Sequence, residues 1–252
     1  MTESLLSLSG RVAIITGAGR GIGAATACAF ARHGGQVALL DRDGAGVAET
    51  AKAIGLAGGD ALPFTVDITD AFAVERLMDR IVEDWGHLDV LVNNAAIVHE
   101  ALLEDVTDDQ WTETLDTNLR AAMVCARAAI PHMLKRGNGR ILSAASVVAR
   151  KGGRGQTCYA ASKGGIVALT RTWARELGPK GITANAVAPG LIDTETMKGF
   201  PGEEMAVLLS RLPAGRLGRA EEVASVYLFL ASDLASFMNG AVVGVDGGLM
   251  LE

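Results

Sequence analysis

The chain has 252 residues, a length that fits one large α/β domain with a full hydrophobic core. Its net charge of −6 argues against a broad nucleic-acid-binding surface, because contacts with phosphates need a basic face. No apolar run approaches the roughly 20 residues of a membrane span, and the cysteines, Cys28, Cys125 and Cys158, form no C-x-x-C pair. We therefore expect a cytoplasmic protein with no nucleic-acid or membrane partner.

Apolar runs of strand length alternate along the chain with longer helical segments. The expected strands are Val12–Thr16, Val37–Asp41, Ala61–Val66, Leu88–Asn93, Arg140–Ala144, Thr183–Ala188 and Ala241–Val245. The expected helices include Ile22–His33, Ala71–Trp85, Asp108–Lys135, Cys158–Leu177 and Glu221–Ala231. Continuous apolar strands are typical of a sheet covered on both faces. The pattern predicts one α/β domain over residues 1–252, a doubly wound, Rossmann-type parallel sheet of about seven strands with helices on both faces.

One segment, 193–218, departs from this alternation. Glycines and prolines surround a short apolar run, Met205–Leu209. Such an insertion before the last helix is typical of a lid over a site, although an ordinary packed connection fits the same pattern. We predict a substrate lid with an apolar wall formed by Met197, Phe200, Met205, Leu208 and Leu209.

The first expected strand leads into a glycine-rich turn that a helix follows. The turn reads T-G-A-G-R-G-I-G over residues 16–23. Its glycines let the backbone approach a pyrophosphate, and the N-terminus of the next helix offers free N–H groups and the positive end of the helix dipole. We therefore expect a dinucleotide here, held by Gly17, Arg20, Gly21, Ile22 and Gly23.

Asp41 ends the second expected strand. A carboxylate at that place accepts hydrogen bonds from the hydroxyls of an adenine ribose. It also repels a 2′-phosphate by about 1–4 kcal/mol per charge pair, depending on the local dielectric. Asp41 thus favours NAD as the cofactor. Arg20 and Arg42 keep NADP open as the less favoured alternative, since either guanidinium can reach a 2′-phosphate.

Tyr159 and Lys163 lie four residues apart on an expected helix, so the phenol and the ammonium share one helical face. We expect the neighbouring cation to lower the phenol pKa, which makes Tyr159 a general acid or base for the oxygen of an alcohol or ketone. The same spacing also occurs on ordinary helices, as a core tyrosine beside a solvated lysine.

Ser146 gives the pair a chemical context, because it follows the strand Arg140–Ala144. The carboxyl ends of the strands are where a doubly wound sheet places its active site. There the Ser146 hydroxyl can hydrogen-bond a substrate oxygen. Asn93–Ala96 and Pro189-Gly190 follow other strands at the same edge.

Taken together, these motifs resemble the short-chain dehydrogenase/reductase family along essentially the whole chain. Its T-G-x-x-x-G-x-G motif is met by Thr16, Gly17, Gly21 and Gly23, and its catalytic set by Asn118, Ser146, Tyr159 and Lys163. The resemblance implies that Lys163 also holds the nicotinamide ribose and that Asn118 positions a water in a proton relay. It further implies cofactor contacts from Asp67, Ile68, Asn94, Ala95, Pro189, Gly190, Ile192 and Thr194. It also implies a homotetramer built through Asp108–Lys135 and Cys158–Leu177.

One position departs from the family pattern. The family reads N-N-A-G where this chain has Ala96 in place of the glycine. If that position required φ > 0, the methyl group would cost on the order of 1 kcal/mol.

Three functions are compatible with these residues. The first is an NAD-dependent oxidoreductase that interconverts a secondary alcohol and a ketone, with a small apolar substrate. The second is an NADPH-dependent 3-oxoacyl-carrier-protein reductase, for which Lys135, Arg136 and Arg175 are candidates for a basic patch. The third is a dinucleotide sensor without catalysis, which the presence of all four catalytic residues disfavours. We expect no metal site, since the histidines have no metal-ligand spacing.

Overall fold

Seven parallel strands form one twisted sheet in the computed structural model, which describes residues 6–195, 205, 207, 209–210 and 212–250. Their order across the sheet is β3-β2-β1-β4-β5-β6-β9. The strands are β1 (Val12–Thr16), β2 (Gln36–Asp41), β3 (Asp60–Thr65), β4 (Val90–Asn93), β5 (Gly139–Ala144), β6 (Ile182–Pro189) and β9 (Val242–Val245). The order reverses between β1 and β4, which confirms the predicted doubly wound, Rossmann-type α/β fold.

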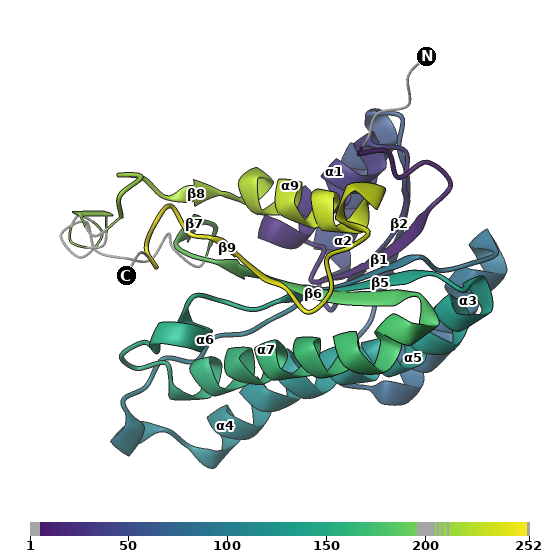
Figure 1. Ribbon diagram of the computed structural model, residues 1–252. Helices are drawn as coiled ribbons and strands as arrows, with labels where there is room; N and C mark the ends of the chain where they lie inside the picture. The colour runs from purple at the N-terminus through teal and green to yellow at the C-terminus, as the bar shows by residue number, and fades with distance from the viewer. Residues whose placement is uncertain (1–5, 196–204, 206, 208, 211, 251–252) are drawn as a thin grey trace.

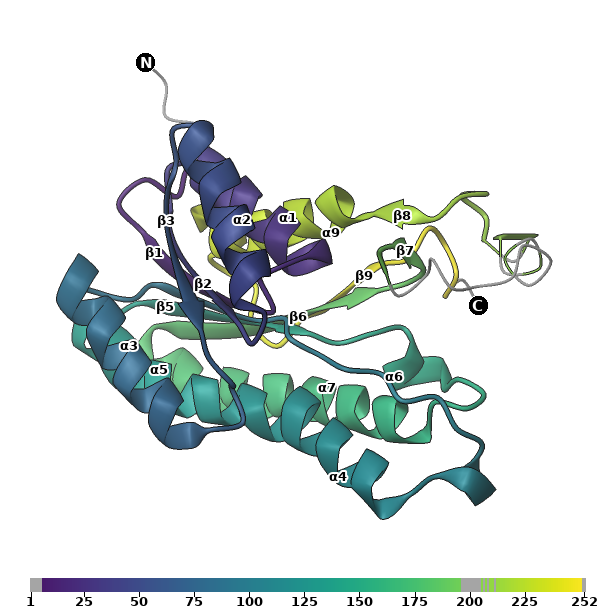
Figure 2. The same ribbon diagram turned by 180° about the vertical axis from the view of Figure 1, so that it is seen from behind.

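Helices cover both faces of the sheet, with α1, α2 and α9 on one face and α3, α4, α5 and α7 on the other (Figures 1 and 2). The helices are α1 (Gly21–Arg32), α2 (Gly44–Leu56), α3 (Ala71–Trp85), α4 (Asp108–Leu115), α5 (Ala121–Arg136), α6 (Val148–Lys151), α7 (Thr157–Leu177) and α9 (Ala220–Ala231). Short 3₁₀ turns span Leu103–Asp105, Gly178–Lys180 and Asp233–Ala235. No helix within the described residues is long and apolar enough to cross a membrane.

The core is divided by the sheet into two apolar layers. Successive side chains of β1 point to opposite faces, so Ile15 packs in the layer under α1 and α9 while Ile14 packs in the layer under α3, α5 and α7. Both side chains are fully buried. This double burial explains why the strands are continuous apolar runs without alternation.

Helix α2 was not identified by the sequence patterns. Gly44, Gly46 and Gly55 all fall within it, and glycine lowers helix propensity by about 1 kcal/mol per residue. Its start is fixed by Asp43, whose carboxylate accepts a hydrogen bond of 3.0 Å from the Gly46 amide. Capping and packing against α1 and β3 outweigh the low propensity.

The predicted helix Asp108–Lys135 is continuous in the structure, but its pitch is not α-helical throughout. A π-helical turn, Asp116–Arg120, separates α4 from α5. The turn inserts extra backbone into the helix at the position of Asn118, as π-turns often do at functional sites. The helical period of the sequence does not reveal such a local change of pitch.

The predicted lid begins and ends on a small parallel ribbon, because β7 (Ile192–Asp193) pairs with β8 (Gly218–Arg219). Of the expected apolar wall, Met197, Phe200 and Leu208 lie outside the described residues. The lid therefore stays a prediction.

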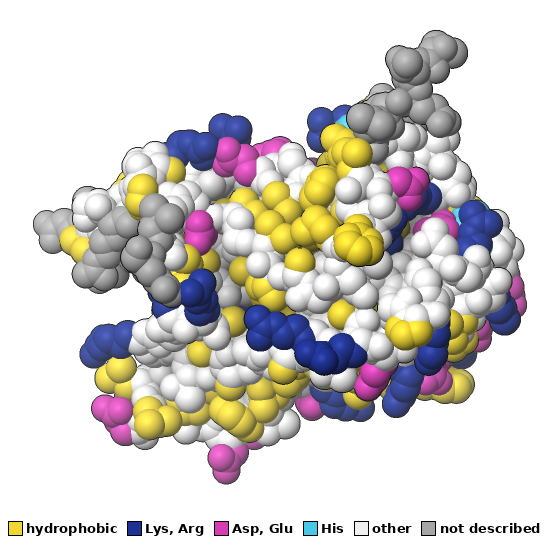
Figure 3. All heavy atoms as spheres, in the orientation of Figure 1, with side chains coloured by type: hydrophobic (Ala, Val, Ile, Leu, Met, Phe, Trp, Pro, Cys, Tyr) yellow, Lys and Arg dark blue, Asp and Glu magenta, His cyan; other side chains and the backbone are white. Residues whose placement is uncertain are grey.

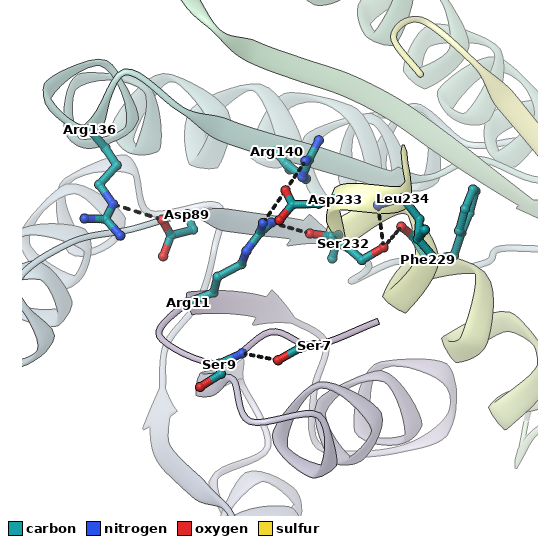
Figure 4. Close-up of polar contacts among 11 residues, drawn as sticks. Ser7, Ser9, Arg11, Asp89, Arg136, Arg140, Phe229, Ser232, Asp233 and Leu234 are labelled. Carbon is teal, nitrogen blue, oxygen red and sulfur yellow. Dashed lines mark hydrogen bonds and ion pairs between the residues drawn. The ribbon is translucent and has the colours of Figure 1, made fainter. Parts of the chain in front are cut away.

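The amino ends of the strands are joined by ion pairs, on the edge opposite to the site described below (Figure 4). Arg11 and Arg140 both contact the Asp233 carboxylate. Nearby, Arg136 contacts Asp89 at 3.3 Å. Asp89 is buried and also accepts a hydrogen bond of 2.8 Å from the Val12 amide. The Asp233 pairs tie the starts of β1 and β5 to the turn after α9, and Asp89 ties the start of β4 to β1 and to the end of α5.

Candidate active site

A cleft of about 1210 Å³ opens along the carboxyl ends of the strands. Nearly all the predicted site residues line it, from the glycine-rich turn, the strand ends and α7. They are Gly17, Arg20, Gly21, Ile22, Asp41, Arg42, Asp67, Ile68, Asn94, Ala95, Ser146, Tyr159, Lys163, Pro189, Gly190, Ile192 and Thr194. Gly23 and Asn118 are the two predicted residues that do not line it.

The glycine-rich turn has a backbone that only glycine can form. Gly17 and Gly21 have φ of +65° and +56°, in the left-handed region. A Cβ atom on Gly23 would lie 1.9 Å from the Gly17 carbonyl oxygen. Gly23 therefore acts by close packing behind the cleft, while Gly17 and Gly21 shape its wall.

Thr16 and Asn94 hold this turn against the end of β4. The Asn94 side-chain amide donates to the carbonyl oxygens of Thr16 and Gly17, at 3.1 and 3.2 Å. In return, the Thr16 hydroxyl accepts from the amides of Asn94 and Ala95, at 3.0 and 3.1 Å. Asn94 thus braces the backbone of the turn.

Asp41 lies at the end of β2 with its carboxylate directed at the glycine-rich turn. One oxygen, Oδ2, accepts a hydrogen bond of 3.0 Å from the Gly19 amide, and Oδ1 accepts one of 3.1 Å from the Asp43 amide. These bonds fix the carboxylate at the edge of the cleft. The Arg20 guanidinium pairs with the Glu195 carboxylate at 3.2 Å, and the Arg20 side chain is 73% exposed.

Asp67 follows β3 on the same side of the cleft. Its Oδ1 accepts hydrogen bonds from the amide and the hydroxyl of Thr69, at 2.9 and 2.7 Å. These bonds, with a smaller contribution from the Arg42 charge, hold the pKa of Asp67 below its usual value. Asp67 thus stays a fixed acceptor in the neutral pH range.

Lys163 is almost completely buried, with 2% of its surface exposed. Its Nζ donates a hydrogen bond of 2.7 Å to the Ala144 carbonyl oxygen and lies 5.5 Å from the centre of the Tyr159 ring. Burial lowers the pKa of Lys163 to about 8. The helical spacing therefore brings the phenol and the ammonium together at the end of β5, as predicted.

The prediction that the cation lowers the Tyr159 pKa is wrong for the structure as it stands. Burial raises the pKa of the phenol, and a hydrogen bond with the Ser146 side chain offsets part of the rise. The physical reason is that desolvation penalises the phenolate, while the Lys163 ammonium directs its hydrogen bond to Ala144. Ser146 is buried too, and its hydroxyl accepts a hydrogen bond of 3.2 Å from the Val148 amide.

Asn118 acts behind the cleft. Its Oδ1 accepts from the Ile97 amide and its Nδ2 donates to the Ile97 carbonyl oxygen, both at 2.8 Å. Nδ2 also lies 3.2 Å from the Ser162 hydroxyl, which donates to the Tyr159 carbonyl oxygen at 2.8 Å. Asn118 thus connects the segment after β4 to the catalytic helix α7.

Ala96 causes no backbone strain. Within the described residues, no residue other than glycine has positive φ, so the position occupied by Ala96 does not need a glycine. Ala96 lines the cleft, and its methyl group is accommodated there.

Comparison with known proteins agrees with this geometry. A family model described as enoyl-(acyl carrier protein) reductase matches residues 17–250. The 3-oxoacyl-[acyl-carrier-protein] reductase of Thermotoga maritima is 40% identical over 246 residues, which cover 98% of this chain and all of that protein. The Pseudomonas aeruginosa enzyme of the same name is 41% identical over 250 residues, with the same coverage.

The chain belongs to the short-chain dehydrogenase/reductase family.

Solved structures of the family superpose closely on this one. A protein from Beutenbergia cavernae described as an NAD(P)-dependent gluconate 5-dehydrogenase, with NADP bound at low occupancy, gives a TM-score of 0.94 at 39% identity. That match covers 99% of this chain and all of the other. A short-chain type dehydrogenase/reductase from Mycobacterium marinum gives 0.94 at 35% identity, with 98% of both chains covered. By its family the chain is an NAD(P)-dependent oxidoreductase that acts on CH–OH groups or the corresponding ketones.

The cleft itself fits such a cofactor. Gly17 and Gly21 line it with no side chain, so a ligand can approach the backbone of the turn, and the fixed Asp41 carboxylate offers acceptors for ribose hydroxyls. Within the part of the chain that the structure describes, no group of three or more His, Cys, Asp or Glu side chains is arranged to hold a metal ion.

Several cleft residues were not anticipated from the sequence. Glu100, Glu113, Lys151, Arg154 and Gln156 line the outer part of the cleft, and Tyr227 lines it from α9. Lys151 and Arg154 flank Gly152 and Gly153, and the sequence does not show which side chains of this segment line the cleft. Nothing in the sequence distinguished Tyr227 from an ordinary core residue of an apolar helix.

Proposed function

We propose that this chain interconverts a ketone and the corresponding secondary alcohol, with Tyr159 as general acid and base. The observation that carries the proposal is that Tyr159, Ser146 and Lys163 meet in one cleft beside the glycine-rich turn. A bound nicotinamide would supply or accept the hydride.

The chain's own residues handle the substrate oxygen. The Ser146 hydroxyl hydrogen-bonds that oxygen, and the Tyr159 phenol donates a proton to it in reduction or takes one from it in oxidation. The raised pKa of Tyr159 suits proton donation, that is, ketone reduction. Lys163 positions the two groups: its bond to the Ala144 carbonyl oxygen ties α7 to the strand end that precedes Ser146, so Tyr159 and Ser146 are held at the same point of the cleft.

A 3-oxoacyl thioester is the substrate class with the strongest support. Both curated relatives above are 3-oxoacyl-carrier-protein reductases that match along their full length. Lys151 and Arg154 are exposed cations at the cleft, where an acidic carrier protein would meet the chain, although Glu100 and Glu113 line the cleft too. The basic patch suggested by Lys135, Arg136 and Arg175 does not support docking, because these residues lie at the ends of α5 and α7 that lead into the amino ends of β5 and β6.

A small hydroxy compound is the second candidate. The Beutenbergia cavernae protein described as a gluconate 5-dehydrogenase is 39% identical to this chain. Glu100, Glu113 and Gln156 at the cleft offer hydrogen-bond partners for hydroxyl groups. This candidate differs from the small apolar alcohol expected from the sequence, because the outer cleft is lined by polar and charged side chains.

We also propose NAD rather than NADP as the physiological cofactor. Its support is Asp41, whose carboxylate is held by the Gly19 and Asp43 amides and would repel a 2′-phosphate. The Beutenbergia cavernae relative has NADP bound, so the preference of this chain is to be measured directly.

The test is a turnover assay of the purified chain with NADH and with NADPH. Acetoacetyl coenzyme A is the thioester probe, and a panel of sugar acids and small secondary alcohols with NAD⁺ tests the second candidate. We expect faster thioester reduction with NADH than with NADPH. Oxidation of a small hydroxy compound without any thioester reduction would overturn the first candidate. Tight dinucleotide binding without turnover of any substrate would support the sensor alternative.

We also propose that the chain forms a homotetramer and works in a reducing compartment. Apolar side chains gather over α9 and β9, as Figure 3 shows. Phe237, which lies in the chain between the turn Asp233–Ala235 and β9, is fully exposed in the single chain. Trp111 is 42% exposed on α4, on the other face of the sheet. The three cysteines are free thiols. Sedimentation of the purified chain tests the assembly: a monomer at micromolar concentration contradicts it.

A further inference from the structure

Six buried polar atoms of the described residues have no hydrogen-bond partner, and one of them belongs to a residue of the cleft wall. The atoms are Asn93 Oδ1, Thr114 Oγ1, His132 Nδ1, Arg140 Nε, Thr183 Oγ1 and Tyr227 Oη. Of these residues, Tyr227 is the one that lines the cleft. Its side chain is fully buried. Since buried hydroxyls in proteins are nearly always hydrogen-bonded, the position of Tyr227 points to a partner that enters the cleft.

Tyr227 approaches the cleft from the face of the sheet opposite to Tyr159. It lies on α9, which packs against α1, whereas Tyr159 and Lys163 lie on α7 across the sheet (Figure 1). Tyr227 shares an apolar cluster with Ala18 of the glycine-rich turn and Ile192 of the segment after β6. Both segments border the cofactor part of the cleft. A group held between α7 and α9 would therefore meet Tyr159 on one side and Tyr227 on the other.

The protonation state of Tyr227 makes it a donor. Burial raises the pKa of its phenol, and negative charge on Tyr159 raises it further. Tyr227 therefore keeps its proton throughout the neutral range. A buried phenol in apolar surroundings is suited to a neutral acceptor, such as a carboxamide or hydroxyl oxygen.

We propose that Tyr227 is a cofactor-positioning residue whose hydroxyl donates a hydrogen bond to the nicotinamide half of a bound dinucleotide. This half offers a carboxamide oxygen and ribose hydroxyls as acceptors. Tyr227 clusters with Ile192, which follows β6, whereas Asp41 ends β2, and β1, β4 and β5 lie between these two strands. This placement favours the nicotinamide half over the adenosine, which the Asp41 side of the cleft would receive. The inference rests on dinucleotide binding and is independent of the choice of substrate.

The test compares two ligands by calorimetric titration of Tyr227→Phe and of the unsubstituted protein. NADH carries the nicotinamide half, and ADP carries only the adenosine and the diphosphate. We expect the Kd for NADH to rise about fivefold to tenfold, as for the loss of one hydrogen bond, while the Kd for ADP stays the same. The Tm of the protein without ligand should stay equal or rise, because phenylalanine fills the same space and removes an unpaired hydroxyl.

Thr183→Val is the matched control. It removes another buried hydroxyl without a partner, at the beginning of β6 and away from the cleft. It should leave both Kd values unchanged. An unchanged Kd for NADH in Tyr227→Phe, or an equal weakening of ADP, overturns the proposal. If the unsubstituted protein binds neither NADH nor NADPH, the assignment of the cofactor site itself is wrong, and the two failures are thereby distinguished.

Discussion

Lys163 donates a hydrogen bond of 2.7 Å from its Nζ to the main-chain carbonyl oxygen of Ala144, the last residue of β5. This bond ties the catalytic helix α7 to a strand end that lies two residues before Ser146. The catalytic lysine and serine are therefore held to each other by main-chain structure. The bond also keeps a cation in a nearly water-free position, which has consequences for catalysis and for stability.

Tyr159→Phe should abolish most of the activity while leaving cofactor binding intact. The phenol is the proposed proton donor, and general acid catalysis contributes about 10²–10⁴-fold to a rate. We expect kcat to fall by that factor and the Kd for NADH to change less than twofold. Stopped-flow turnover and fluorescence titration measure the two quantities. Unchanged turnover would exclude the proposed role of Tyr159.

Lys163→Met should make the protein without cofactor more stable at neutral pH. Burial lowers the folded-state pKa of Lys163 to about 8, compared with an ordinary value of 10.5, so the charged form destabilises the fold. Allowing for the lost bond to Ala144, the gain is about 1–2 kcal/mol in the free energy of unfolding at pH 7. Because the unfolded chain binds the extra proton between pH 8 and 10.5, the native protein gains stability over that range.

The difference in the free energy of unfolding between Lys163→Met and the native protein should therefore be smaller at pH 9.5 than at pH 7. Urea unfolding at pH 7 and pH 9.5 gives the two differences. A gap that widens with pH contradicts the lowered pKa.

Asp41→Ser should shift the cofactor preference toward NADPH. Removing one carboxylate relieves about 1–4 kcal/mol of repulsion from a 2′-phosphate, enough for a tenfold change in the ratio of kcat/KM values for NADPH and NADH. Glu49→Gln is the control, since Glu49 is exposed on α2 and does not line the cleft. An unchanged ratio in Asp41→Ser would show that Asp41 does not select the cofactor.

Two glycine-to-alanine changes should have opposite effects. Gly23→Ala brings a Cβ to 1.9 Å from the Gly17 carbonyl oxygen, so the turn must shift and dinucleotide binding should be lost, with a destabilisation of about 1–3 kcal/mol. Gly55→Ala, in α2, meets nothing within 4 Å and should stabilise the protein by about 0.5–1 kcal/mol. Thermal unfolding without NADH measures the change in stability of each variant, and the increase in Tm on adding NADH measures dinucleotide binding. Normal NADH binding by Gly23→Ala would contradict the close packing of the turn.

Asp233→Asn should weaken the ion-pair group at the amino ends of the strands. Arg140, with 5% of its side chain exposed, would lose its carboxylate partner, at a cost of about 1 kcal/mol. The Arg11 hydrogen bond holds the pKa of Asp233 below its usual value. The ionised Asp233 carboxylate therefore contributes to the free energy of unfolding above about pH 4, and this contribution is lost as the pH falls further. Asp84→Asn, which removes an exposed pair with Arg80, serves as the control and should cost almost nothing.

The parts of the fold that the sequence predicted are those with a strong repeated signal. The buried strands are continuous apolar runs, and helices such as Ala71–Trp85 have a polar and an apolar face, so their positions followed directly. Helix α2 was not predicted because its glycines resemble loop residues. The turn Asp116–Arg120 was not predicted because a change from α to π pitch leaves the residue pattern intact.

The candidate site was predictable where chain order fixes position. Glycine turns and strand ends meet at one edge of a parallel sheet, so Gly17, Asp41 and Ser146 could be placed together. The Tyr159 pKa could not be predicted, since it depends on how deeply the phenol is buried. Tyr227 was not predicted because its helix is apolar on several sides, and only the packing of α9 on α1 decides which residue reaches the cleft.

At the π-helical turn between α4 and α5, the number of residues is as important for the site as their chemical type. A regular helix rotates by about 100° for each residue. An insertion or deletion of one residue therefore rotates the side chains before it by about 100° relative to those after it. A deletion within Asp116–Arg120 that restored a regular helix would turn Asn118 away from Ile97, or turn α4 away from α7. The spacing between Thr107, which caps α4, and Asn118 is for this reason under a geometric constraint that side-chain substitutions along the outer surface of α4 do not share.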